Sequence, residues 1–259
     1  MVILDEQWKD CQDRQKLDAS PAARRGWYDT VIVSRIKITR QCAGRNIPLI
    51  ENITEAEIVR SDSHHSPSIR FKWGDAGLGR ICYDFKPDKA LTRADITVNL
   101  WTRHHTALRQ LGLCVYLMHP TGRDAVVACG PWAGTDCLSY IVAGIKAPTR
   151  HDLDAVYRRT EDLRITEKMP ALPGYWHQIG IHIDTHVRGA VCFSYQPLGF
   201  PDAKRKISGR LAPLAPGRDY KRIQGLALGQ LPFPTYNNKL RRDNGITDVR
   251  FGRVLVTTP

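Results

Sequence analysis

Long apolar runs and a secretory leader are both missing from this sequence of 259 residues. No apolar run approaches the roughly 20 residues that a membrane-spanning helix needs. Residues 1–6 lack the basic start and apolar core of a signal peptide. We therefore expect a cytoplasmic protein that does not interact with membranes.

Paired cysteines are also missing. The seven cysteines are irregularly spaced and none forms a Cys-x-x-Cys motif, whereas structural zinc sites need paired ligands at close spacing. The sequence therefore predicts reduced thiols, and we expect no cofactor.

The common motifs of covalent and nucleotide chemistry do not occur. There is no Gly-x-Ser-x-Gly, no Walker loop and no pair of carboxylates at helical spacing in an apolar setting. These absences argue against a serine hydrolase and a nucleotide-dependent enzyme.

Positive charge is abundant and unevenly distributed. The chain has a formal net charge of +12, and its last 59 residues hold twelve basic and four acidic side chains, a net charge of +8. Such a local excess of cations, with aromatic residues among them, is typical of a surface that binds a polyanion. Nucleic acid is the first candidate.

Alternating and apolar segments predict many strands, while helices are expected at only a few places. A polar helical pattern covers 1–17, a buried helix is predicted over 137–145, and a mixed-charge helix over 148–165. The Pro- and Gly-rich region 198–238 is expected to form mostly loops. Strands are predicted over residues 30–40, 69–73, 81–85, 96–100, 113–118, 125–129, 181–187, 190–195 and 253–256.

Two groups of histidines could carry chemistry. His64 and His65 lie in a polar loop, where an imidazole can act as a general acid or base. His182, Asp184 and His186 alternate along one predicted strand, and with His177 they are candidate ligands for a divalent metal ion. A polar outer strand face explains the same alternation, and both interpretations stay open.

The C-terminal segment resembles a known family. Gly245, Arg250 and the Phe251-Gly252 pair precede a terminal strand, and this arrangement is similar to the end of the CRISPR repeat-processing endoribonucleases of the RAMP superfamily, including their divergent type IV form. The resemblance implies an α+β fold with two ferredoxin-like domains, residues 1–130 and 131–259. The helical insertion would lie near 148–165 and the glycine-containing loop near 243–252.

The resemblance also implies a function. It suggests a metal-independent endoribonuclease that cuts a CRISPR repeat transcript by 2′-hydroxyl attack, leaving a cyclic phosphate. The enzyme would stay on the repeat hairpin of the crRNA with other effector subunits. The implied catalytic candidates are Arg35, Arg40, Arg242, His64 and His65. RNA-backbone contacts would come from Arg24, Arg25, Lys204, Arg205, Lys206, Arg210, Arg218, Lys221, Arg222, Arg241 and Arg250.

Two alternatives accompany this hypothesis. The chain could be a non-catalytic RNA-binding subunit of a CRISPR ribonucleoprotein, because no histidine lies between Arg40 and Ser63 to serve as the family's usual base. It could instead be a metal-dependent nuclease or hydrolase that uses His182, Asp184 and His186.

Overall fold

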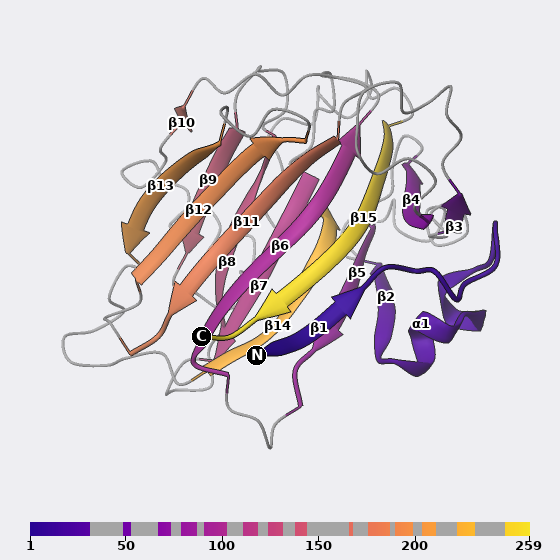
Figure 1. The fold of residues 1–259 in the computed structure, drawn as a ribbon, viewed down its shortest axis with the longest axis horizontal. Coiled ribbons are helices and arrows are strands. Elements are labelled where there is room, and N and C mark those ends of the chain that lie inside the picture. Colours follow the sequence, from indigo (N-terminus) through magenta and orange to yellow (C-terminus); the bar gives the residue numbers. More distant parts are fainter. Residues whose placement is uncertain are drawn as a thin grey trace, which may run out of the picture.

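Two antiparallel β-sheets stacked face to face make up the part of the chain that the structure, a computed structural model, describes (Figure 1). The described residues are 1–31, 49–52, 67–73, 79–86, 91–102, 111–118, 124–131, 138–143, 166–167, 176–186, 190–198, 204–210, 222–230 and 247–259. Among them, no helix is long and apolar enough to cross a membrane.

Sheet A, nearer the viewer in Figure 1, has the strand order β13-β12-β11-β6-β15-β4-β3, and β1 pairs with the end of β15 that β4 leaves open. Its strands are β1 (Val2–Glu6), β3 (Leu49–Asn52), β4 (Pro67–Trp73), β6 (Arg93–Thr102), β11 (Trp176–Asp184), β12 (Ala190–Pro197), β13 (Arg205–Arg210) and β15 (Thr247–Thr257).

Sheet B lies behind it, with the order β10-β9-β8-β7-β14-β5-β2. Its strands are β2 (Trp27–Val31), β5 (Gly79–Asp84), β7 (Leu111–Met118), β8 (Asp124–Pro131), β9 (Leu138–Ala143), β10 (Thr166–Glu167) and β14 (Arg222–Gln230). The described helices are the 3-10 turn η1 (Leu17–Ala19) and the single-turn α1 (Pro21–Arg24).

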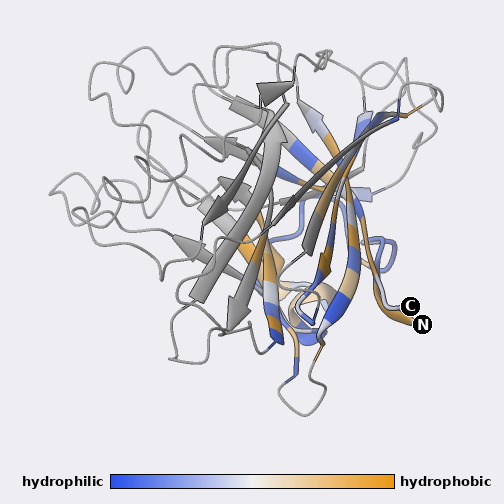
Figure 2. Cartoon of the chain, turned by 90° about the vertical axis from the view of Figure 1, so that its left-hand side faces the viewer, coloured by the Kyte–Doolittle hydropathy of each residue, from blue (hydrophilic) through white to orange (hydrophobic). Residues whose placement is uncertain are grey.

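The core fills the space between the sheets because apolar residues alternate along the central strands. β6, β11 and β15 of sheet A contribute buried aliphatic side chains that join those of β5 and β14 of sheet B in one cluster. Burying each such side chain contributes about 1.5–3 kcal/mol. Figure 2 shows the two layers from the side, with hydrophobic and hydrophilic residues alternating along the strands that are coloured. The members from sheet A include Ile96, Val98, Leu100, Ile179, Ile181, Ile183, Val254 and Val256.

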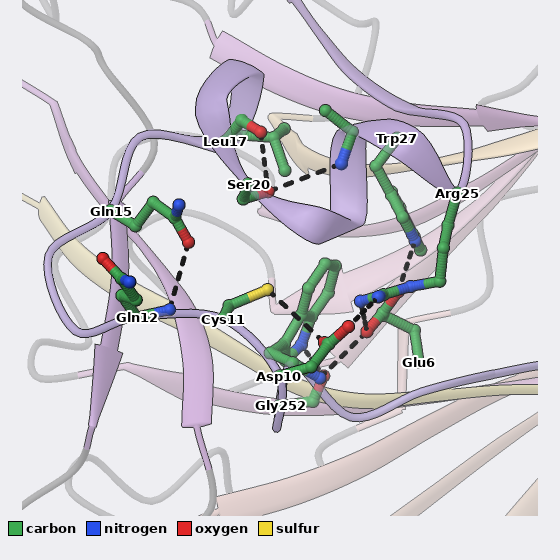
Figure 3. Close-up of polar contacts among 12 residues, drawn as sticks. Glu6, Asp10, Cys11, Gln12, Gln15, Leu17, Ser20, Arg25, Trp27 and Gly252 are labelled. Atoms are coloured by element: carbon green, nitrogen blue, oxygen red, sulfur yellow. Dashed lines mark hydrogen bonds and ion pairs between the residues drawn. The ribbon is translucent and has the colours of Figure 1, made fainter.

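The buried carboxylate of Glu6 accepts hydrogen bonds at one edge of the sandwich (Figure 3). Glu6 of β1 is 3 % exposed. Its Oε1 accepts from the Trp8 backbone N–H at 2.9 Å and from Nη2 of Arg25 at 2.8 Å. Its Oε2 accepts from Nε of Arg25 at 2.9 Å and from the Trp27 indole at 3.1 Å. Because β1 belongs to sheet A and Trp27 to sheet B, this carboxylate ties the two sheets together.

The predicted α+β fold with two ferredoxin-like domains is wrong. Both sheets combine strands from the first 130 residues with strands from the rest: β6 lies between β11 and β15, and β14 lies between β7 and β5. A strand's alternating pattern shows that it is a strand, but it does not identify the distant segment beside it. The predicted domains therefore group strands that are neighbours in sequence but not in space.

Local predictions failed where a pattern fits two structures. The predicted helix over 137–145 contains strand β9, because a short buried apolar run suits a helix or a strand equally well. The predicted helix over 1–17 begins with strand β1. The predicted terminal strand over 253–256 is confirmed as part of β15. The proposed helix at 148–165 and residues 243–246 of the glycine loop lie outside the described residues.

The region 198–238, expected to form loops, contains β13 and β14. Gly225 makes the sequence of β14 look less like a strand, yet β14 has no room for a side chain at this position. A Cβ at this position would lie 2.6 Å from the carbonyl oxygen of Tyr83. The glycine sits where the pairing of β14 with β7 shifts register, so it permits close approach rather than ending the strand.

A surface ion pair on β1 gives a prediction for acid stability. Arg253 donates from Nε and Nη2 to the two carboxylate oxygens of Asp5, both at 2.8 Å. The hydrogen bond from Arg253 lowers the pKa of Asp5. A lowered pKa stabilises the folded state above the pKa of the unfolded chain, and this stabilisation is lost as the pH falls through the folded-state value.

We therefore expect Asp5→Asn to lower the free energy of unfolding at pH ~7 by no more than about 1 kcal/mol, since the pair is partly exposed. The difference from the wild type should shrink as the pH falls below about 3.9, the ordinary pKa of an aspartate, and disappear below the lowered folded-state value. Urea unfolding of both proteins at neutral pH and through the acid range measures this. A difference of the same size in acid would contradict the role of the ion pair.

Candidate functional site

The outer face of sheet A, which points away from sheet B, carries the candidate site. Alternation places Ile96, Val98 and Leu100 of β6 in the core, so the residues between them face outward. The same parity on β11 directs its even-numbered residues outward. Register brings these outward residues together as the pairs Trp101–Trp176, Asn99–Gln178, Thr97–Gly180, Asp95–His182 and Arg93–Asp184.

One pair on this face is suited to proton transfer. Nδ1 of His182 lies 2.8 Å from Oδ1 of Asp95, and the two side chains are 42 % and 51 % exposed. An ionised carboxylate only accepts hydrogen bonds, so Nδ1 is the donor. In the neutral imidazole, Nε2 then has the free lone pair and can act as a base.

An ion pair occupies the next register position. Nε of Arg93 lies 2.7 Å from Oδ2 of Asp184, with side-chain exposures of 50 % and 12 %. Oδ1 of Asp184 accepts from the backbone N–H of His186 at 2.9 Å. Asp184 is therefore a fixed carboxylate that holds a half-exposed guanidinium.

The opposite end of the same face is aromatic. Trp101 and Trp176 are 5 % and 0 % exposed and pack together with the partly buried Leu198. Cζ of Arg250 lies 4.9 Å from the centroid of the Trp101 ring, a cation–π distance. The outer face therefore changes from aromatic to amide and then to charged side chains along β6 and β11.

Gly252 connects this face to the N-terminal segment. Its carbonyl accepts from the indole N–H of Trp8 at 2.8 Å. On the other side, a Cβ on Gly252 would lie 3.2 Å from Cζ3 of Trp176 and 3.3 Å from Cβ of Asn99. A glycine at this irregularity of β15 allows Trp176 to lie against the strand.

We expect Gly252→Ala to destabilise the protein by about 1–3 kcal/mol, the usual cost of overpacking. Its methyl group would displace the indole of Trp176, so near-ultraviolet circular dichroism should change along with the thermal midpoint. Thr97→Ala, which removes atoms from the same face, is the comparison variant. An unchanged spectrum and midpoint for Gly252→Ala would contradict the close packing.

The proposed metal ligands do not form a cluster. His177 is one of the odd-numbered residues of β11 that face the core, whereas His182 and Asp184 face outward. His186 follows the end of the strand. No three His, Cys, Asp or Glu residues within the described ranges could hold a metal ion together. The alternating pattern instead reflects a polar outer face.

The other predicted site residues are scattered or undescribed. Arg35, Arg40, His64, His65, Arg218, Lys221, Arg241 and Arg242 lie outside the described residues. Arg24 is exposed in α1, whereas Arg25 binds Glu6 and Asp10, and Glu6 raises the pKa of its guanidinium. Lys204 is exposed just before β13, which carries Arg205, Lys206 and Arg210. Arg222 lies partly buried on sheet B, and Arg250 is buried on sheet A.

Sequence reasoning missed the residues on β6. Arg93, Asp95, Thr97 and Asn99 alternate with apolar residues, which marks them as an outward face. The pattern was available over 93–101, but it did not indicate that this strand would lie beside β11. The alternation along β11 therefore suggested a metal ligand at His182 and gave no indication that Asp95 is its partner.

Comparison with known proteins identifies the fold. No protein-family description and no curated sequence matches the chain. Solved structures with the same arrangement include the PL-14 alginate lyase from Aplysia kurodai, with a TM-score of 0.57, 10 % identity and full coverage of both chains. A conserved carbohydrate esterase of the Shiga toxin-encoding bacteriophage phi24B has a TM-score of 0.52 at 9 % identity, covering 99 % of this chain and 97 % of its own.

A further similar structure is a mutant of alginate lyase Aly36B in complex with alginate tetrasaccharide, with a TM-score of 0.50 and 8 % identity over 83 % of this chain and 84 % of that one. At these identities the likeness establishes a shared β-sandwich of the jelly-roll type and nothing finer.

The resemblance to the RAMP superfamily is therefore wrong, and so is the CRISPR RNA-processing function that it implied. The fold is that of proteins described as carbohydrate lyases and esterases, not the ferredoxin-like fold that the resemblance requires. The short C-terminal motif of Gly245, Arg250 and Phe251-Gly252 was too brief to specify a family. The cytoplasmic location and the effector-subunit partners stay predictions that nothing in the structure tests.

Proposed function

We propose that this chain is an enzyme that cleaves an acidic polysaccharide by β-elimination on the outer face of sheet A. The observation that carries the proposal is the half-exposed His182–Asp95 pair, which offers a base at Nε2 on the outer face of sheet A, near one end of β6 and β11. The shared fold with two alginate lyases supports the choice of a carbohydrate substrate.

The surroundings of the pair suit a sugar chain. The amides of Asn99 and Gln178 are neighbours in register and are partly exposed, so they can donate to and accept from hydroxyl groups. A row of outward groups along two strands gives an extended polymer several contacts, as binding sites with a few placed polar groups do.

The charge of the chain supports an anionic substrate. A net charge of +12 attracts any polyanion, because long-range electrostatics respond to charge density and not to chemical identity. The sequence evidence that first suggested nucleic acid therefore applies equally to a polymer of uronic acids. Sheet A ends at β13, whose six residues include Arg205, Lys206 and Arg210.

The experiment is incubation of the purified chain with alginate, polyglucuronate and a neutral glucan. β-Elimination creates a C4=C5 double bond, which absorbs ultraviolet light, so the absorbance should rise with the uronate polymers only. New reducing ends without this absorbance would indicate hydrolysis instead. Binding without any cleavage would leave a carbohydrate-binding protein and would refute the enzymatic proposal.

A further inference from the structure

We propose that Arg93 binds the carboxylate of the sugar unit whose proton His182 removes, so that these two residues form one uronate subsite. This inference rests on the proposed function and adds the residue that recognises the acidic group. Its evidence is the ion pair beside the proton-transfer pair.

Asp184 orients the Arg93 guanidinium. The carboxylate takes Nε of Arg93 through one oxygen and the backbone N–H of His186 through the other. Because Asp184 holds Arg93 through Nε, the two Nη groups can still donate in parallel to another carboxylate. The Arg93 side chain is half-exposed, so a ligand can reach that edge.

The spacing of the two pairs fits one sugar unit. Arg93 and Asp184 are opposite each other in register, and Asp95 and His182 occupy the next outward position along the same strands. Outward positions two residues apart along a strand are separated by about 7 Å. A uronate placed over both pairs can direct its carboxylate to Arg93 and its C5–H to His182.

The reaction then has a balanced course. Nε2 of His182 takes the C5 proton, and the electrons of that C–H bond form the C4=C5 double bond. The C4–O bond breaks, and the departing oxygen takes a proton from water. Negative charge builds on the uronate carboxylate as the proton leaves, and the Arg93 guanidinium stabilises it. Imidazolium returns its proton to solvent, so no cofactor or water addition is needed.

Arg93 supplies the positive charge of these two described pairs, whose other charged side chains are the carboxylates of Asp95 and Asp184. Removing Arg93 would take that positive charge away while both carboxylates remain near the sugar, and like charges at such distances repel. Within the two pairs, Arg93 is therefore the side chain that can attract a uronate carboxylate.

The test is Arg93→Gln, measured on polyuronate and by calorimetry with a uronate trisaccharide and its methyl ester. We expect kcat/KM on polyuronate to fall about 10- to 100-fold, the effect of losing hydrogen bonds to a charged group. Affinity for the free acid should fall similarly, while affinity for the methyl ester changes less than about threefold. Arg93→Lys should recover part of the loss, because lysine restores the positive charge but not the two parallel N–H donors of the guanidinium.

Arg24→Gln is the control, since it removes one positive charge from exposed α1 and leaves the sheet unchanged. An Arg93→Gln variant that binds and cleaves uronate like the Arg24→Gln variant would overturn the subsite. Equal losses toward acid and ester would also overturn it, because the residue would then be structural. If the wild type binds uronate without cleaving it, calorimetry still decides the role of Arg93 while the enzymatic proposal fails.

Discussion

Replacing His182 by alanine is expected to lower kcat on acidic polysaccharide by about 10²- to 10⁴-fold, the usual contribution of a positioned general base. His182 donates from Nδ1 to Asp95, which leaves Nε2 as the basic nitrogen at an exposed position of sheet A. Without the imidazole, the pair loses the nitrogen that would take the substrate proton, and only the carboxylate of Asp95 remains. Steady-state elimination rates measure the loss.

Asp95→Asn should cause a smaller loss, because it weakens the hydrogen bond that orients the imidazole without removing the imidazole. His186→Ala is the matched control: it lies just beyond β11, is exposed, and its contact to Asp184 uses the backbone N–H, which alanine keeps. Retained activity in His182→Ala, or an equal loss in His186→Ala, would refute His182 as the base.

Replacing Glu6 by alanine is expected to lower the free energy of unfolding by about 2–5 kcal/mol, because it leaves two buried N–H donors without their acceptor, at about 1–3 kcal/mol each. Glu6 accepts four hydrogen bonds, from Trp8, Trp27 and two nitrogens of Arg25. Alanine would leave the indole N–H of the fully buried Trp27 without its acceptor between the two sheets. Denaturant unfolding followed by tryptophan fluorescence measures the change.

The matched comparison is Asp10→Ala, which removes the other carboxylate bound by Arg25. Asp10 is 56 % exposed, so water replaces the lost contact, and the expected change is less than about 1 kcal/mol. Similar effects of the two substitutions would show that Arg25, and not burial of Glu6, determines the stability of this edge.

The sequence allowed individual strands to be predicted but not their arrangement. Alternation over 181–187 and the apolar terminal segment identified parts of β11 and β15 correctly. Pairing of β6 with β11 joins residues about eighty positions apart, and no local pattern encodes that choice. The pair His182–Asp95 was unpredictable for the same reason, although both residues lay on visibly alternating segments.

Charge indicated a class of ligand, a polyanion, but could not identify which one. A basic C-terminal region predicts affinity for a polyanion, and nucleic acids and acidic polysaccharides satisfy that condition equally. Some cations also serve the fold: Arg25 and Arg253 are paired with carboxylates of the N-terminal strand and its continuation. Composition alone cannot separate cations that bind a ligand from cations that hold a strand.

The pairing of β1 with β15 constrains the order of events during protein synthesis. Residues 2–6 leave the ribosome about 250 residues before their partners, residues 254–257, and Trp8 likewise precedes Gly252, whose carbonyl accepts from its indole N–H. Until β15 emerges, β1 and the central strand β6 each lack a neighbour. The growing chain must therefore keep unpaired strand edges in solution while the residues between β1 and β15 are made, a period in which aggregation and chaperone binding compete with folding.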